Sequence, residues 1–180
     1  MPFTPFHMGP GLLWKGLQPA GLSLMTFGLA QVLIDLEPLY VLKTGKDFLG
    51  VPGHLHGISH TILGATVIGV VAGAFGRPLT HLGLRLLGQS QFIPVRWGVI
   101  WWSAFFGTYS HLLLDAVMHR DVEPFVPISR WNPLVGLVDV GTLHRFCIIT
   151  ALAGMLLYVG RWMIRTALPR AKVGETRPIL

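Results

Sequence analysis

Charged residues are scarce in this chain. They make up 12% of its 180 residues, whereas hydrophobic residues reach 52%, and the mean hydropathy is +0.59. A typical soluble domain carries roughly 25% charged residues, so this chain lacks the polar surface that water requires. We therefore expect an integral membrane protein, and its length is that of a single domain covering residues 1–180.

Other absences exclude several classes of protein. Cys147 is the single cysteine, which rules out an intrachain disulfide and a Cys-rich zinc site. No basic region precedes an apolar run at the N-terminus, so we expect no cleavable signal peptide. The sequence has neither a G-x-S-x-G nucleophile motif nor a Gly-rich phosphate loop. Its net charge of +6 comes without a basic-aromatic motif, so we expect no nucleic-acid partner.

Long apolar segments are what the chain does contain. A helix needs roughly 20 apolar residues to cross a bilayer, and four segments reach or approach that length. Residues 12–17 form a shorter apolar piece, which predicts an N-terminal half-helix, and residues 77–96 predict an interfacial amphipathic segment. The fold class predicted is an all-α, polytopic membrane helical bundle with the bilayer as its partner. The four predicted spans are residues 21–42, 58–75, 97–118 and 143–164.

The distribution of Lys and Arg predicts the orientation. Cytoplasmic loops carry an excess of these residues, and both 77–96 and the tail 167–180 are basic and poor in acid. We therefore expect a cytoplasmic C-terminus. The loops 43–57 and 119–142 mix both signs of charge and are expected on the outer face.

Ionisable residues within and beside the spans are gathered rather than scattered. Such residues are costly in a membrane and therefore indicate function. Because successive spans alternate in direction, the end of the first, the start of the second and the end of the third lie at one membrane face. All three places carry residue types that ligate metals. These are Asp35 and Glu37, then His56 and His60, then His111, Asp115 and His119.

The spacing within two of these groups is typical of helical metal sites. His56 and His60 are four residues apart, as are His111 and Asp115, so each pair projects from one face of a helix. Two ligands one turn apart can hold a single ion. His119 would continue the second stripe by one more turn.

Two further elements are expected at the same face. Asp35 and Glu37 would diverge on a regular helix, but Pro38 disfavours helix at Glu37. The helix is therefore expected to end there, which would let both carboxylates reach the site. His7 directly precedes the half-helix, and if this segment dips into the membrane, the first span brings Asp35 back to His7.

A structural interpretation competes with the metal site. A single buried Asp–His pair is more often a packing feature, whereas three converging segments favour a metal. His81 falls in the opposite loop and is expected at the surface, and the two interpretations are evenly balanced for His144. Ionisable residues of the flanking loops are interpreted as solvated, with support of the ligands as the alternative. They are His54, Asp121, Glu123 and Asp139.

Four sequence elements occur in a characteristic order. They are His7 before the half-helix, LIDLEP at the end of the first span, HGISHT, and SHLLLD followed by a Pro-rich loop. Together they resemble the bacterial inner-membrane family of membrane-bound metal-dependent hydrolases, over most of residues 1–136. The resemblance implies an inner (plasma) membrane location and hydrolase chemistry. The chain departs from the pattern at Gly57, where relatives often have Arg, and at Pro38, where a His often follows.

The expected ligand set combines imidazole and carboxylate without thiolate. Such a set suits Zn most, with Mn or Fe as alternatives, and its size suggests one or two ions. With the resemblance, it predicts hydrolysis of an ester or phosphoester, in a small-molecule or lipid substrate, by metal-activated water. Glu37 and His119 are the candidates for the catalytic base or acid. The predicted metal ligands are His7, Asp35, His56, His60, His111 and Asp115.

Two other classes of function remain open. Intramembrane His and Asp also line the metal or proton pathways of transporters, although the span halves remote from this cluster are apolar or small. A buried polar cluster could instead fix helix register in a structural membrane subunit. That alternative predicts no bound metal and mild effects of single substitutions.

Overall fold

The computed structural model describes residues 4–46 and 54–167, so most of the predicted tail lies outside the described residues. Within the described ranges the regular elements are all helical, which confirms the predicted all-α bundle. Two short 3-10 turns, η1 (Ile58–His60) and η2 (Ser90–Phe92), join the longer helices. These helices are α1 (Thr4–Leu17), α2 (Leu24–Ile34), α3 (Leu36–Thr44), α4 (Ile62–Leu86), α5 (Trp97–Met118) and α6 (Val140–Ala167).

Three helical segments among the described residues are long and apolar enough to cross a membrane: Leu24–Thr44, Ile62–Leu86 and Val140–Ile164. The predicted span 97–118 coincides with α5 but is not among these three. Polar residues of α5, among them His111, lower its mean hydropathy. In the fold α5 packs against both α2 and α4, and its Thr108, His111 and Asp115 are buried inside the bundle.

Helix α4 is longer than the sequence predicts. The second span was expected over 58–75 with a separate interfacial segment at 77–96, but α4 continues without interruption to Leu86. The physical reason is a continuous packing face against α2. A Cβ on Gly76 would meet Thr26, and a Cβ on Gly83, two turns further along α4, would meet Met25.

The first span is interrupted at Asp35. This residue ends α2 and begins α3, with φ −81° and ψ −6°. The expected end of the helix at Glu37 is therefore wrong, because the break comes two residues earlier and a second helix follows. Pro38 lies in the first turn of α3, where a missing backbone N–H costs little.

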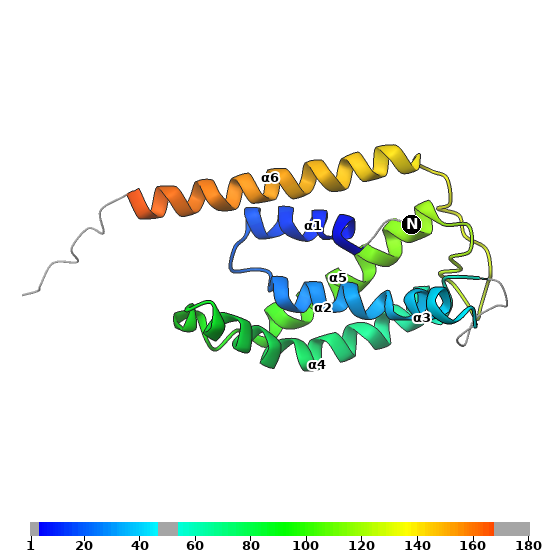
Figure 1. Ribbon diagram of the computed structural model, residues 1–180, viewed down its shortest axis with the longest axis horizontal. Coiled ribbons are helices and arrows are strands. Elements are labelled where there is room, and N and C mark those ends of the chain that lie inside the picture. The colour runs from blue at the N-terminus through cyan, green and yellow to red at the C-terminus, as the bar shows by residue number, and fades with distance from the viewer. Residues whose placement is uncertain (1–3, 47–53, 168–180) are drawn as a thin grey trace, which may run out of the picture.

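The helices form stacked layers (Figure 1). Helices α1 and α6 run side by side in the same direction along one side of the molecule, and α4 lies along the opposite side. Helices α2 and α5 lie between them and contact each other as well as α4. The start of α1, α3, the start of α4 and the end of α5 all lie at one end of the bundle (Figure 1). That end carries the polar residues singled out in the sequence.

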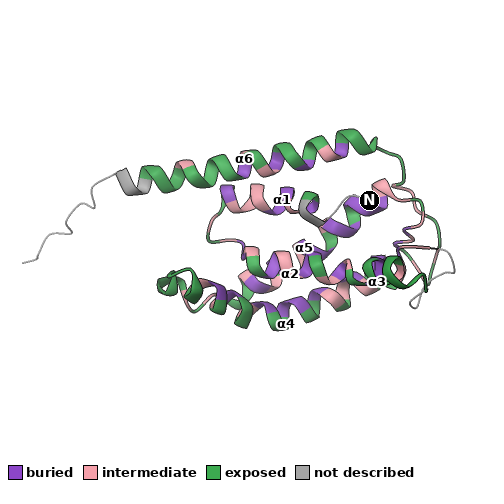
Figure 2. Ribbon diagram, in the orientation of Figure 1, coloured by how far each residue is buried: buried purple, intermediate pink, exposed green. Residues whose placement is uncertain are grey.

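Small residues bring α1 and α6 into close contact. A Cβ on Gly9 would collide with the carbonyl of Cys147, and a Cβ on Gly154 would collide with the backbone at Leu12. Arg161 of α6 donates to the carbonyl of Gly16 at 2.6 Å, near the end of α1. Most of the remaining surface of α6 is exposed (Figure 2), as expected for a helix that faces lipid.

Candidate metal centre

Asp115 lies at the centre of a cluster of imidazoles at one end of the bundle. Its Oδ2 is 3.0 Å from Nε2 of His60 and 3.0 Å from Nε2 of His111. Its Oδ1 is 3.3 Å from Nε2 of His7 and 3.8 Å from Nε2 of His119. Since α1, η1 and α5 each contribute, the fold unites residues far apart in the sequence.

Asp35 brings a second carboxylate to this cluster. Its Oδ1 is 3.1 Å from Nε2 of His111 and 3.9 Å from Nε2 of His60. Asp35, His60, His111 and Asp115 each offer a ligand atom within 4.8 Å of the others, and we call these four residues the inner group. Two donors on one tetrahedral zinc, each about 2.1 Å from the ion, lie about 3.4 Å apart. The inner group therefore has nearly the size of a metal site.

Gln31 determines which ring nitrogen of His111 carries the proton when the ring is neutral. Its Nε2 donates to the carbonyl of Gly107 at 3.2 Å, which leaves Oε1 to accept from Nδ1–H of His111 at 2.6 Å. In the neutral ring, Nε2 then carries a lone pair, and this buried atom has no hydrogen-bond partner. It lies 3.0–3.1 Å from Asp35 and Asp115. A second proton or a metal cation is needed there, so the donor set fits a divalent metal.

Gln31 is a member of the polar cluster that the sequence analysis missed. It is fully buried and lies one helical turn before Asp35 on the first span. This spacing of four residues was the available signal, because it places both side chains on one face of a helix.

His7 also has a ring nitrogen without a partner. It is 1% exposed, yet its Nδ1 has no hydrogen-bond partner, and its Nε2 faces Oδ1 of Asp115 at 3.3 Å. Leaving a buried polar group unpaired costs about 1–3 kcal/mol. Its ring centroid lies 4.3 Å from that of His111, so a cation held by the inner group would lie within its reach. The structure thus brings His7 to Asp115, as the sequence predicts.

A second group adjoins the first and is more exposed. His56, His119 and Asp121 each offer a ligand atom within 4.8 Å of the others, and we call them the outer group. Nδ1 of His56 lies 3.0 Å from Oδ2 of Asp121. The same carboxylate oxygen accepts the backbone N–H groups of Leu55 at 2.9 Å and of His56 at 3.1 Å.

The structure gives Asp121 partners that the sequence analysis did not assign. Its interpretation as a solvated charge is wrong, because its side chain is partly buried and paired with His56. Burial would raise the pKa of Asp121, but the hydrogen bond and charge of the His56 ring, together with the backbone N–H groups of His56 and Leu55, lower that pKa. Burial lowers the pKa of His119. The available signal was the H-x-D spacing of His119 and Asp121.

Glu37 binds backbone rather than the imidazole cluster. Its Oε2 accepts the N–H of Ser59 at 2.6 Å and its Oε1 accepts the N–H of Ile58 at 3.2 Å. A Cβ on Gly57 would meet this carboxylate, so a larger residue there would displace the Glu37 side chain from its present position. Because η1 carries His60, this geometry makes Glu37 a positioning residue. Its predicted catalytic role stays a prediction.

Substitutions of Glu37 separate the two roles. In Glu37→Ala the two N–H groups of η1 lose their acceptor, and we expect metal affinity to fall about 10- to 100-fold. Glu37→Gln keeps one accepting oxygen, so its loss of affinity should be smaller. Calorimetric titration of the purified protein with Zn²⁺ measures both. Full metal affinity in Glu37→Gln together with abolished hydrolysis would instead indicate a catalytic carboxylate.

Other ionisable residues lie outside both groups. His144 is half-buried, and its ring lies 5.2 Å from that of Phe6. His81 is near the far end of α4 and accepts a backbone N–H at 3.1 Å. Asp139 accepts a backbone N–H at 2.8 Å at the start of α6. None of these three belongs to a group of metal-ligand atoms among the described residues.

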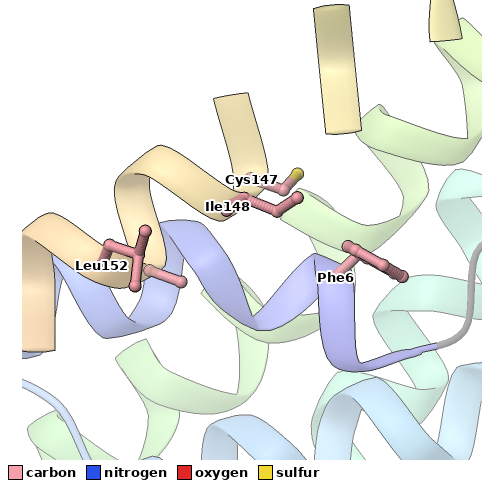
Figure 3. A pocket seen from close by; sticks show the side chains of 5 residues that line it. Phe6, Cys147, Ile148 and Leu152 are labelled. Carbon is pink, nitrogen blue, oxygen red and sulfur yellow. The ribbon is translucent and has the colours of Figure 1, made fainter. Parts of the chain in front are cut away.

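An apolar groove of about 220 Å³ lies between α1 and α6 (Figure 3). Its lining offers neither imidazole nor carboxylate, so it is not the candidate metal centre. The groove is lined by Phe6, Cys147, Ile148, Ala151 and Leu152.

Comparison with known proteins gives one family. No curated protein and no solved structure matches the chain. A family model described as YdjM inner membrane protein matches residues 11–170. The matched segment includes the inner and outer groups and begins after His7. This match and the three apolar helices identify a membrane protein of a bacterial inner-membrane family. The chain belongs to the YdjM inner membrane protein family.

Proposed function

We propose that this inner membrane protein is a metal-dependent hydrolase of esters or phosphoesters, with its metal held by the inner group and His7. The observation that carries the proposal is the placement of Nε2 of His111. That atom is buried and faces two carboxylates at 3.0–3.1 Å, so nitrogen and oxygen donors converge where a cation would be held. Zn suits this set of nitrogen and oxygen donors, with Mn or Fe as alternatives.

The residues of the site would have different roles in hydrolysis. A divalent cation, when bound, supplies Lewis acidity and lowers the pKa of a water molecule that it contacts. Gln31 holds His111 in the orientation needed for binding, and Glu37 holds the turn that carries His60. His119 is the candidate acid or base, because its side chain is 23% exposed while its Nε2 faces Asp115. It can therefore contact both the substrate and the inner group.

The position of the site favours a substrate at the membrane surface. Both groups lie at one end of the bundle (Figure 1), where the spans end and lipid headgroups would begin. An ester or phosphate ester of a lipid, or a small molecule at that surface, could reach it. The basic segment 77–96 and the basic tail favour a cytoplasmic C-terminus, and with that orientation the site would face outward.

Transport is less well supported. The end of the bundle remote from the metal centre contains buried hydroxyls, but Ser23 and Thr26 both pair with Thr80, at 2.7 and 3.0 Å. Along the helices, a cluster of fully buried alanines lies between these hydroxyls and the inner group. The side chains of this alanine cluster offer no polar group to carry an ion or a proton. The alanines are Ala30, Ala72 and Ala104.

The proposal is tested by metal content and hydrolysis together. We expect the protein, purified in mild detergent, to contain at least one equivalent of Zn, Mn or Fe by inductively coupled plasma mass spectrometry. It should hydrolyse a chromogenic phosphoester or ester, and chelation should abolish the activity. His111→Ala should lose the metal and reduce the rate at least about 100-fold, because it removes an inner-group ligand.

His81→Ala is the matched control, since it removes a His from the opposite end of α4. It should keep both the metal and the rate. Wild-type protein that stays metal-free after incubation with Zn²⁺, Mn²⁺ and Fe²⁺ would overturn the proposal and favour a structural subunit.

A further inference from the structure

We propose that the outer group, His56, His119 and Asp121, forms a second metal site that shares Asp115 with the inner group, and His119 then acts as a ligand in place of an acid–base role. The proposal rests on the metal-binding half of the proposed function but not on hydrolysis. Two imidazoles and one carboxylate, each with a ligand atom within 4.8 Å of the others, make a donor set for a borderline divalent ion such as Zn²⁺.

The two groups are in direct contact. The ring centroid of His56 lies 4.7 Å from that of His60, and each residue belongs to a different group. His119 connects them from the other side, because its Nε2 is 3.8 Å from Oδ1 of Asp115. Two ions held by these groups would therefore be close neighbours, as in two-metal hydrolytic sites with ions about 3.5–4 Å apart.

The two oxygens of Asp115 face different partners. Oδ2 lies 3.0 Å from both imidazoles of the inner group, His60 and His111. Oδ1 instead faces His7 at 3.3 Å and His119, of the outer group, at 3.8 Å. Of the two oxygens, Oδ1 alone lies within 4 Å of an imidazole of the outer group. Asp115 is therefore the carboxylate suited to bridge two cations.

The outer group is built differently from a simple ion pair. A pair would need only His56 and Asp121, which lie 3.0 Å apart. The ring of His119 is nevertheless stacked on that of His56, with centroids 4.5 Å apart and an interplanar angle of 30°. An ion pair does not need this second ring, whereas a metal site of three protein ligands does.

Exposure predicts a difference in affinity between the two sites. The side chains of His119 and Asp121 are 23% and 29% exposed, whereas those of His60 and His111 are fully buried. Water competes for ligands at the more open site, so we expect its ion to bind more weakly. Two neighbouring ions would also favour a phosphoester over a carboxylic ester as the substrate, because they can stabilise both the phosphoryl oxygens and the leaving oxygen.

Metal stoichiometry tests the second site without any assay of activity. The metal-free protein would be titrated with Mn²⁺ and followed by electron paramagnetic resonance, with total metal measured in parallel. We expect two equivalents in the wild type, with spin coupling between the second ion and the first. His119→Ala and Asp121→Asn should each bind one equivalent and show the uncoupled spectrum of a single Mn²⁺. His54→Ala, a loop His outside both groups, is the matched control and should bind two.

Asp121→Asn keeps an oxygen for the backbone N–H groups of Leu55 and His56, so it separates loss of a ligand from loss of the loop. One equivalent in both the wild type and His119→Ala would overturn the second site and leave the proposed function standing. Two equivalents in His119→Ala and Asp121→Asn would also overturn it. Two coupled ions in a protein without hydrolase activity would support the second site and count against the proposed function alone.

Discussion

Replacing Asp115 by asparagine is expected to remove nearly all bound metal and to reduce hydrolysis by a factor of at least about 10³. Asp115 is the one carboxylate whose oxygens lie within 4 Å of four imidazoles among the described residues. Asparagine has nearly the same size but lacks the negative charge, and one of its two ends becomes an NH₂ donor. A donor facing the imidazoles cannot ligate a cation.

The measurement compares metal content and rate in Asp115→Asn and in Asp139→Asn. Asp139 is exposed and only caps the start of α6, so its variant should keep the metal and the rate. Elution of both variants as single symmetric peaks in detergent would show that they fold. Wild-type metal content in Asp115→Asn would contradict the central role of this carboxylate.

Leucine in place of Gly154 is expected to separate α1 from α6 and to disturb the metal centre from a distance. A Cβ at this position would overlap the backbone of α1 at Leu12. Backbone cannot rotate aside as a side chain can, so the two helices would have to move apart. Overpacking of a tight contact typically costs 1–3 kcal/mol, and a clash with backbone should lie at or above the top of that range. Because α1 carries His7, its displacement should also weaken metal binding.

Cys147 offers a direct measurement of this separation. It is the single cysteine of the chain and is 3% exposed, with its carbonyl packed against Gly9 of α1. We expect maleimide to label it at least about tenfold faster in Gly154→Leu than in the wild type, because opening the contact exposes the thiol. Gly160→Leu is the matched control, since a Cβ there meets nothing within 4 Å. Equal labelling rates in all three proteins would show that the contact tolerates the larger side chain.

The sequence predicted the end of the bundle at which the polar residues meet. Asp35, His60, His111 and Asp115 were expected together because successive spans alternate in direction, and their ligand atoms do lie within 4.8 Å of one another. The reasoning succeeds since it needs only the order and length of the spans. The predicted span 97–118 also has the bounds of α5, because a largely apolar segment ends where the chain meets water.

Predictions that depended on local signals were less successful. Asp35, rather than Glu37, interrupts the first span, and α4 continues to Leu86, into the first half of the segment expected at the interface. In both places contacts with other helices decide the outcome. Pro38 fits in a first turn, and the face of α4 that contains Gly76 and Gly83 stays packed on α2.

Composition and the alternation of spans by themselves determined that this is a helical membrane protein with a His- and Asp-rich end. Only the tertiary structure decided how those residues divide into an inner and an outer group, and which residues support them. Gln31, Glu37 and Asp121 acquire their roles from partners 80, 22 and 65 residues away. Hydrogen bonds are short and directional, so their partners depend on the packing of whole helices, which no local pattern in the sequence specifies.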